Sequence, residues 1–561
     1  MILAFEFEYL SENGILESLL GEICQDFGIS FTVGHENHHV TLLVEDNEEI
    51  LGKFADFLGE ALPLSIFFKS SSVYVAEKFP EIKEKSLASH LPITFTPKRL
   101  KNSELSSSNE YLLPSIDFKT SKDSLNLKTP HTMLCASDAP SLEKLYDTMA
   151  EMIAKGECIA LHLACGEYVL GNIEAIGTLK DSSNMEVIAT DLSMVERMVV
   201  IRENEIKALA TLERPAIRCK VNAIYAQKNI LPLQRVYIRL ADELWMHHLC
   251  RRLFAQGVQF LFRAPLSSAS VDVQTVLEST AKLNALKPLR ICVLENGEIV
   301  IVEGNSFASQ TLLENHQKFA EPSHATFVSI LQEHQLFEVK TTCFYLSKTH
   351  DDKIMNYSKE HGILDLTRVS IPLSFESLFE RIEKSSESAT RLVENYKTHF
   401  PEIYEKAINT AIPENSPKSI FTLWKIASVV FGFSQEFEKA GDALVELAED
   451  FGGQKGPRMD YFLQKEDTLA SDFDYIRLLR SGMSFKLAGV DDATLSFGYV
   501  QSLAYFIADS ADSYKESFES ANIALSGGLF GYRRLTEMVY KNLKPNHHIC
   551  LNLELPLECD A

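Results

Sequence analysis

The sequence predicts a multidomain protein that combines α/β and α+β domains, and three observations lead to this prediction. The chain has 561 residues, more than one hydrophobic core usually organises, so three or four domains are expected. Residues 1–79 alternate strand and helix patterns, and residues 132–268 alternate short apolar runs with amphipathic helices, as in an α/β domain. Apolar residues make up 45% of the chain and charged residues 24%, so enough apolar material is present for several packed cores.

Residues 1–79 show a β-α-β-β-α-β pattern. This is the order of a small ferredoxin-like domain, with two helices on one face of a four-stranded antiparallel sheet. The strand patterns are MILAFEFEYL, ISFTVG, HHVTLLVE and LSIFFKSSSVYVAE, and the helix patterns are GILESLLGEICQDFG and EEILGKFADFLGEAL. Residues 80–131 are rich in Ser, Lys and Asp with little apolar periodicity, so a linker or a long surface excursion is expected there.

A third folded region is expected at residues 287–561. It begins with RICVLENGEIVIVE, in which Asn296-Gly297 joins two β-branched runs, and this dipeptide supplies the positive φ angles of a tight hairpin. Its middle shows apolar residues at three- and four-residue spacing, which predicts helices. Its end reads as a strand, a Ser-Gly-Gly turn, a helix and a last strand, HHICLNLEL.

The charge and the cysteines exclude several classes of function. The chain has 54 basic and 78 acidic residues, a net charge of −24, so its surface repels phosphate backbones and nucleic acid is not an expected partner. Ten cysteines form no C-x-x-C pair, which excludes zinc ribbons, thioredoxin motifs and three-cysteine radical clusters. The first residues do not read as a signal peptide, and the apolar run at 419–433 contains Lys425 and is too short for a bilayer. A cytoplasmic protein without membrane insertion is therefore expected.

The second and third regions resemble parts of a known family. ECIALHLACGE (157–167) and VIATDLSMVERMVVIRENEIKALATLERPAIRCK (187–220) resemble the YrdC-like domain of HypF, the carbamoyltransferase that begins cyanide-ligand synthesis for nickel–iron hydrogenases. ALVELAED (443–450) and ALSGGLFGYRRL (524–535) resemble its Kae1-like domain, an actin-like ATPase (ASKHA) fold. The matching runs of the YrdC-like domain are His162-Leu163-Ala164-Cys165, Leu212-Glu213-Arg214-Pro215 and Met246-His247-His248-Leu249.

The resemblance implies the domain order of HypF. It places an acylphosphatase-like domain at 1–79, a linker in place of zinc fingers at 80–131, a YrdC-like domain at 132–268 and a Kae1-like domain at 287–561. No cysteine occurs between residues 80 and 131, so the zinc sites of the family are absent.

Other family motifs are also changed. An acylphosphatase loop holds phosphate with an Arg, whereas the stretch YLSENGILESLL has Glu12 and no Arg. The basic run that holds ATP and carbamate in the YrdC-like domain is reduced to Lys180, with Asp181 and Glu186 added. A carboxylate at such a place repels a phosphate, so loss of hydrolysis and of carbamoyl-adenylate formation is expected.

The metal site of the Kae1-like domain is affected as well. The family motif V-Q-H-H-H-A-H binds a metal through imidazoles, and by position RVSIPLSFESLF (368–379) takes its place here. Ile371, Pro372 and Leu373 then stand where ligands would be. The closing family motif N-D-G-G is represented at best by Asp560.

The Ser-Gly-Gly turn is the candidate nucleotide site. In actin-like ATPases a Gly-Gly turn before a helix lets the backbone approach the adenosine, because a Cβ would collide with it. The alternative interpretation is a strand-to-helix turn that requires one positive φ, and both interpretations stay open. The residues proposed to bind ATP or ADP are Ser526, Gly527, Gly528, Gly441, Glu446 and Lys180.

Two His/Cys pairs are weak metal candidates. MHHLC places His247 and Cys250 on one helical face, and NHHIC places His548 and Cys550 on one strand face. Nickel or another soft metal would suit either pair, but two ligands do not make a site, so no metal is assigned. The histidines of GHENHHV are expected in a solvated hairpin turn.

The predicted function is that of a catalytically reduced HypF relative. It would serve nickel–iron hydrogenase maturation as a binding or scaffold factor for the hydrogenase large subunit or another maturation protein. Packing between domains tolerates substitutions that destroy a phosphate or metal site, so domain order can persist without chemistry. The alternatives are an active ATP-dependent carbamoyl or acyl transferase, and a chaperone gated by ATP or ADP.

Overall fold

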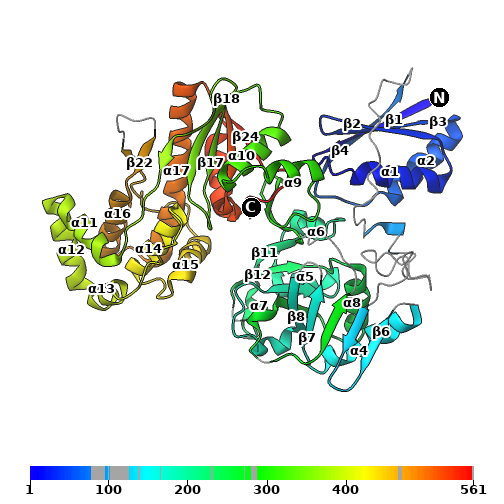
Figure 1. Ribbon diagram of the computed structural model, residues 1–561, viewed down its shortest axis with the longest axis horizontal. Coiled ribbons are helices and arrows are strands. Elements are labelled where there is room, and N and C mark those ends of the chain that lie inside the picture. Colours follow the sequence, from blue (N-terminus) through cyan, green and yellow to red (C-terminus); the bar gives the residue numbers. More distant parts are fainter. Residues whose placement is uncertain are drawn as a thin grey trace. The chain divides into compact units, whose positions relative to one another are not determined.

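The computed structural model divides the chain into two compact units, which are described separately (Figure 1). Unit 1 comprises Met1–Val293 and Glu303–Gln310, and unit 2 comprises Leu294–Val302 and Thr311–Ala561. Most of the predicted linker lies outside the described residues. The residues described are 1–76, 95–98, 100, 125–136, 139–163, 166–228, 230–231, 233–270, 272–279, 287–464 and 470–558.

The first sheet of unit 1 has the predicted ferredoxin-like arrangement. Its strand order is β2-β3-β1-β4, each pair is antiparallel, and both helices lie on one face (Figure 1). Alternate residues of β1 are buried on that face, where Phe5 packs edge-on against Phe54 of α2 at 5.7 Å between ring centroids. The elements are β1 (Ile2–Tyr9), α1 (Ile15–Phe27), β2 (Phe31–Glu36), β3 (His39–Glu45), α2 (Glu48–Ala61) and β4 (Phe68–Ala76).

The second sheet of unit 1 is mixed, with strand order β15-β11-β12-β9-β13-β8-β7-β14-β5-β6. Neighbours are parallel at β15-β11, β12-β9 and β7-β14, and the other described pairs are antiparallel. The strands are β5 (Leu125–Lys128), β6 (Met133–Ala136), β7 (Ile159–Leu163), β8 (Gly166–Asn172), β9 (Glu186–Ala189), β10 (Val199–Val200), which pairs with β11, β11 (Ala216–Val221), β12 (Arg235–Arg239), β13 (Phe260–Pro265), β14 (Val276–Ser279) and β15 (Arg290–Val293).

Helices α4 and α8 pack together with this sheet and enclose its core. Trp245, Met149 and Leu261 are among the core residues. Strand β5 precedes residue 132, where the sequence suggested that the domain begins, so the sheet extends into the polar segment. The helices are α4 (Ala139–Ala154), α5 (Val195–Met198), α6 (Glu203–Leu209), α7 (Ala223–Ala226) and α8 (Leu244–Ala255).

Unit 2 contains a five-stranded sheet with order β19-β18-β17-β23-β24. The pairs β17-β23 and β23-β24 are parallel, whereas the pairs β17-β18 and β18-β19 are antiparallel. Phe327 of α10 packs on one face of the sheet, and Phe344 of β17 meets Tyr514 of α17 on the other. The strands are β17 (Thr341–Tyr345), β18 (Lys353–Ser358), β19 (Gly362–Asp365), β23 (Asn522–Ser526) and β24 (His548–Leu551).

Helices make up most of the remainder of unit 2, together with a small sheet β20-β22-β21. The predicted Asn296-Gly297 turn is present, with φ +86° at Gly297. The elements are β16 (Ile299–Glu303), α9 (Gln310–His316), α10 (Pro322–Glu333), β20 (Thr367–Arg368), α11 (Phe375–Ser385), α12 (Glu387–His399), α13 (Pro401–Ile408), α14 (Ile420–Phe431), α15 (Phe437–Asp450), β21 (Leu463–Gln464), β22 (Ser471–Phe473), α16 (Tyr475–Leu487), α17 (Asp492–Phe518) and α18 (Arg533–Leu543).

The apolar run at 419–433 forms the buried helix α14. Trp424 at its centre is fully buried, and its indole N–H donates to the hydroxyl of Tyr461 at 2.7 Å. Within the described residues, no helix combines the length and the apolar character that a membrane crossing requires.

Candidate functional site

The glycine turn after β23 packs directly on the backbone that follows β17. Gly527 has φ +95°, and a Cβ at this position would lie 2.2 Å from the carbonyl oxygen of Leu346. The Leu529 amide donates to the same oxygen at 3.1 Å, which fixes the turn against the strand end. Gly527 thus has two requirements that come from the chain itself, a positive φ and a close backbone approach. This positive φ at Gly527 is what the interpretation as a strand-to-helix turn requires.

A carboxylate of the chain occupies the donors of this turn. Oε1 of Glu558 accepts the amide protons of Gly528 at 2.7 Å and of Lys348 at 2.6 Å, and Oε2 accepts the hydroxyl proton of Thr349 at 2.8 Å. The hydroxyl of Ser526 and the amide of Gly527 both donate to the carbonyl of Leu557 at 3.0 Å. The segment before Glu558 is therefore anchored by its backbone, and the carboxylate fills a small site lined by hydrogen-bond donors.

The ammonium group of Lys348 lies beside this site and has its own partners. Nζ is 3.2 Å from Oδ1 of Asp442 and lies over the rings of Phe421 and Tyr532, at 5.1 and 4.9 Å from their centroids. The hydroxyl of Tyr532 also donates to Asp442. The side chain of Lys348 is therefore engaged by Asp442 and by two aromatic rings, whereas its backbone amide donates to Glu558.

A second carboxylate, that of the buried Asp352, stabilises the loop after β17. Asp352 is buried and accepts the amide protons of Ser347 and Ile420, each at 2.6 Å. Burial raises the pKa of Asp352 well above its ordinary value. The Ser347 hydroxyl accepts the amides of Thr349 and His350 at 3.0 and 2.7 Å. Side chains of the protein therefore already take up the amide protons of Ser347, Lys348, Thr349 and His350.

The other residues predicted to bind nucleotide have different surroundings. A Cβ on Gly441 would lie 2.5 Å from the Phe421 ring, so this glycine allows α14 and α15 to pack closely. Glu446 is half-buried on the same helix. Lys180 belongs to unit 1, where its side chain is exposed and its amide donates to the carbonyl of Ser268 at 2.9 Å. Asp560 lies outside the described residues.

In both His/Cys pairs the cysteine is buried, whereas His247 is half-buried and His548 is exposed. Cys250 is in the core of the second sheet and burial raises its pKa to about 12, so the neutral thiol is favoured. The ring of His247 packs edge-on against Phe95 at 6.2 Å, and burial lowers its pKa to about 4. On β24, Sγ of Cys550 lies 3.4 Å from Nδ1 of His548, and burial raises the pKa of Cys550 to about 12. Neither pair belongs to a group of three ligand side chains among the described residues.

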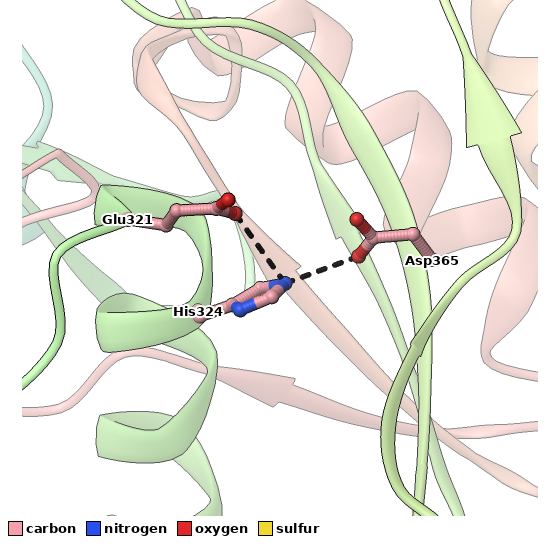
Figure 2. A group of neighbouring side chains, drawn as sticks. All are labelled: Glu321, His324 and Asp365. Atoms are coloured by element: carbon pink, nitrogen blue, oxygen red, sulfur yellow. Dashed lines mark hydrogen bonds and ion pairs between the residues drawn. The ribbon is translucent and has the colours of Figure 1, made fainter.

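A different His cluster, which the sequence reading missed, gathers three such side chains (Figure 2). Nε2 of His324 lies 3.1 Å from Asp365 and 3.6 Å from Glu321. Nζ of Lys353 lies 2.5 Å from Glu321 and 2.7 Å from Asp365, so one ammonium group already bridges the two carboxylates. The cluster is therefore an ion-pair network. Glu321 and His324, three residues apart at the start of α10, are the part of this cluster that could have been found from the sequence. Asp365 and Lys353 come from the ends of two other strands.

A groove of about 1170 Å³ lies at the segment to which the sequence assigned the histidine motif. Ile371, Pro372 and Leu373 line it together with Arg368, and no histidine does. Leu373 is 90% exposed. The assignment of this segment to the family motif stays a prediction.

The loop expected to resemble an acylphosphatase site is closed by side chains of the protein. Oδ1 of Asn13 accepts the amide proton of Ile15 at 3.0 Å, and its amide group donates to the carbonyl of Phe307 at 2.9 Å. Ser11 accepts the amide proton of Asn13 at 3.1 Å, and Glu12 points to solvent. Asn13 therefore takes up an amide proton within the loop and joins the loop to the segment of Phe307 in unit 1.

The second sheet gathers basic residues that the sequence reading did not single out. Glu186 of β9 accepts hydrogen bonds from Arg239 at 3.1 Å, Arg263 at 2.8 Å and Arg290 at 2.8 Å. Arg239 and Arg263 are almost fully buried. The three guanidinium groups hold the pKa of Glu186 well below its ordinary value although burial opposes this. From the sequence, Glu186 is interpreted as a carboxylate added where the family has basic residues. That interpretation is incomplete, because strands β12, β13 and β15 supply three cations.

Two further carboxylates complete the charge balance of this arginine cluster, by which we mean Arg239, Arg263 and Arg290 with their acidic partners. Asp242 lies 3.3 Å from Arg239 and 2.9 Å from Arg263, and Glu303 lies 2.8 Å from Arg290. Three guanidinium groups therefore face three carboxylates. A cluster with no excess positive charge offers little free energy for holding an external anion.

The Leu212-Glu213-Arg214-Pro215 run links the two sheets of unit 1. Glu213 is buried and accepts the hydroxyl proton of Ser65 at 2.5 Å and the amide proton of Ile66 at 3.0 Å. Arg214 lies over the ring of Phe95 at 4.5 Å. The acidic and basic residues of this run are therefore engaged in packing within the unit.

Comparison with known proteins agrees with this architecture. No protein-family model matches the chain. The chain is 25% identical to Protein HydE of Wolinella succinogenes over 573 aligned positions, which cover 100% of this chain and 99% of the relative.

Two solved structures have a similar fold. Full-length HypF in its phosphate- and nucleotide-bound form superposes with a TM-score of 0.65 and 13% identity, covering 99% of this chain and 96% of HypF. HypF of T. kodakarensis superposes with a TM-score of 0.64 and 12% identity, covering 98% and 96%. The resemblance expected from the sequence is thus confirmed: the chain has the multidomain fold of HypF and is similar to HydE along its whole length.

Proposed function

We propose that this protein is a HypF-related accessory factor for the maturation of nickel–iron hydrogenase, and that it acts by binding other proteins without turning over ATP. Its similarity to HydE and the fold of HypF support the link to hydrogenase maturation. The proposed partner is the hydrogenase large subunit or another maturation protein.

One observation carries the non-catalytic part of the proposal. At three places where groups that could hold an oxyanion come together or were expected, the protein's own groups take up the donors. Glu558 fills the glycine turn, three carboxylates neutralise the arginine cluster, and Asn13 with its neighbours closes the first loop. Transfer of a carbamoyl or acyl group needs preorganised positive groups that face the substrate, and these groups are engaged elsewhere.

A specific observation favours the alternative of an active ATP-dependent carbamoyl transferase. The arginine cluster brings together three guanidinium groups from separate strands, and the HypF whose structure matches was solved with nucleotide and phosphate bound. If the carboxylates rearranged, these cations would suit a phosphate-bearing substrate.

The two functions are separated by carbamoyl-phosphate-dependent ATP–pyrophosphate exchange on the purified protein, with full-length HypF as the positive control. We expect no exchange above background. Exchange that is lost in Lys180→Ala but kept in Lys155→Ala, a change of another exposed lysine of unit 1, would establish the transferase instead.

The binding role is tested in cells that express the hydrogenase. Tagged protein should retain the hydrogenase large subunit or a named maturation protein through washing, and loss of the protein should lower hydrogenase activity. Normal hydrogenase activity in its absence, with neither partner retained, would refute the proposal.

A further inference from the structure

The Glu558 side chain is bound in the way that a protein binds an oxyanion. Its two oxygens accept three hydrogen bonds of 2.6–2.8 Å from two backbone amides and one hydroxyl. The two amides come from separate segments, one from the loop after β17 and one from the turn after β23. Converging backbone amides of this kind form a concave site that favours anions, and hydrogen bonds to an ionised acceptor are among the stronger ones in proteins.

The backbone of the turn is shaped to let an oxygen atom approach. A Cβ on Gly528 would lie 2.8 Å from Oε1 of Glu558, so any larger residue would press on the bound carboxylate. The ammonium group of Lys348 is engaged by Asp442 and two aromatic rings, so the donors of the site are backbone amides and a hydroxyl. The site therefore combines close backbone access and three donors.

The segment that carries Glu558 does not depend on its side chain for attachment. The Leu557 carbonyl accepts from Ser526 and Gly527, and the Leu557 amide donates to the carbonyl of Ile301 at 2.9 Å. Glu558 itself is half-buried and is the last residue that the structure describes. Removing its carboxylate should empty the donor site and leave the segment in place.

We propose that Glu558 is an internal anion that closes an oxyanion site, and that this site takes a phosphate group once the carboxylate is removed. The ligand class is a tetrahedral phosphate oxyanion, either free or as part of a nucleotide. The inference deepens the proposed function and rests on it, because Glu558 in the glycine turn is one of the observations that carry its non-catalytic part.

The test is calorimetric titration of the full chain with inorganic phosphate, ATP and adenosine. The variants are Glu558→Ala, which removes the carboxylate, and Glu360→Ala, which makes the same charge change at an exposed glutamate. We expect Glu558→Ala to bind phosphate at least about tenfold more tightly than the wild type and Glu360→Ala, because the vacated donors are charge-assisted ones. Binding of ATP but not of adenosine would show that the phosphate groups are recognised, and ATP tighter than phosphate would identify a nucleotide as the better ligand.

Two further variants keep the test decisive. Thr349→Val added to Glu558→Ala should weaken phosphate binding several-fold, because it removes one donor. Should Glu558→Ala not fold, Glu558→Ser also removes the carboxylate from the donors and should still bind phosphate more tightly than the wild type. Equal phosphate affinity in the wild type and in the folded Glu558 variant, or no phosphate binding by that variant, would overturn the inference. Either result is independent of the exchange assay, which is done on the wild type.

Discussion

The arginine cluster of unit 1 and the glycine-turn site of unit 2 satisfy their charged or polar groups in different ways. In the arginine cluster, guanidinium groups from three strands face the carboxylate of Glu186 on a fourth strand of the same sheet. In the glycine turn, backbone amides and a hydroxyl face the half-buried carboxylate of Glu558. We therefore expect removal of the Glu186 charge to lower stability, and removal of the Glu558 carboxylate to leave the fold intact.

The largest loss of stability is expected in the arginine cluster, whose charged groups are part of the core. Glu186→Gln removes the charge that neutralises three arginines, two of them almost fully buried, and should lower the free energy of unfolding by about 3–5 kcal/mol. Urea unfolding followed by circular dichroism measures the change. Glu303→Gln is the control, since Glu303 is more exposed and pairs with one arginine, and it should cost about 1 kcal/mol or less. Equal losses in the two variants would show that burial of the paired charge does not set the cost, and would contradict the account of the cluster as part of the core.

The next effect concerns the shape of the glycine turn. Gly527→Ala should cost about 3 kcal/mol, because the new Cβ meets a backbone oxygen at 2.2 Å in addition to the strain of a positive φ. Gly362→Ala is the matched control, with φ +67° and nothing within 4 Å of its Cβ, and should cost about 1 kcal/mol. Thermal unfolding distinguishes them. A Gly527 variant as stable as the Gly362 variant would show that the contact with Leu346 does not constrain the turn.

A smaller effect is expected from a buried histidine of unit 1. Burial lowers the pKa of His247 to about 4. As the pH falls, this histidine is therefore protonated at a higher pH in the unfolded state than in the folded state. This group therefore favours the folded state above its ordinary pKa, and its contribution is lost as the pH falls from about 6.5 to 4, by roughly 2 kcal/mol. The melting temperature of His247→Gln should fall less than that of the wild type between pH 7 and pH 4.5. His361→Gln, a change of an exposed histidine, should behave like the wild type, and the same acid sensitivity in all three proteins would contradict the burial argument.

Local patterns of the sequence predicted much of the fold. The β-α-β-β-α-β order of the first domain follows from apolar alternation, because one face of each strand and helix must be buried. The hairpin turn at Asn296-Gly297 follows from the φ angles that this dipeptide adopts readily. The resemblance to HypF rested on short runs such as Leu212–Pro215, and comparison over the whole chain confirms it.

The sites were less predictable because their partners are far apart in the chain. Glu558 and Lys348 are separated by 210 positions, and Glu186 and Arg290 by 104. No local periodicity specifies such pairs, since they depend on which strands become neighbours in the sheets. His324 with its partners was missed for the same reason, and Cys250, read as a metal candidate, turned out to be a core residue.

The central claim is that the protein's own carboxylates keep phosphate-bearing ligands out. Calorimetric titration of the wild-type chain with ATP and Mg²⁺ tests it most directly. The account predicts no saturable heat at millimolar ATP, where full-length HypF serves as the positive control. Saturable binding to the wild type that is abolished by Gly528→Trp would contradict the claim.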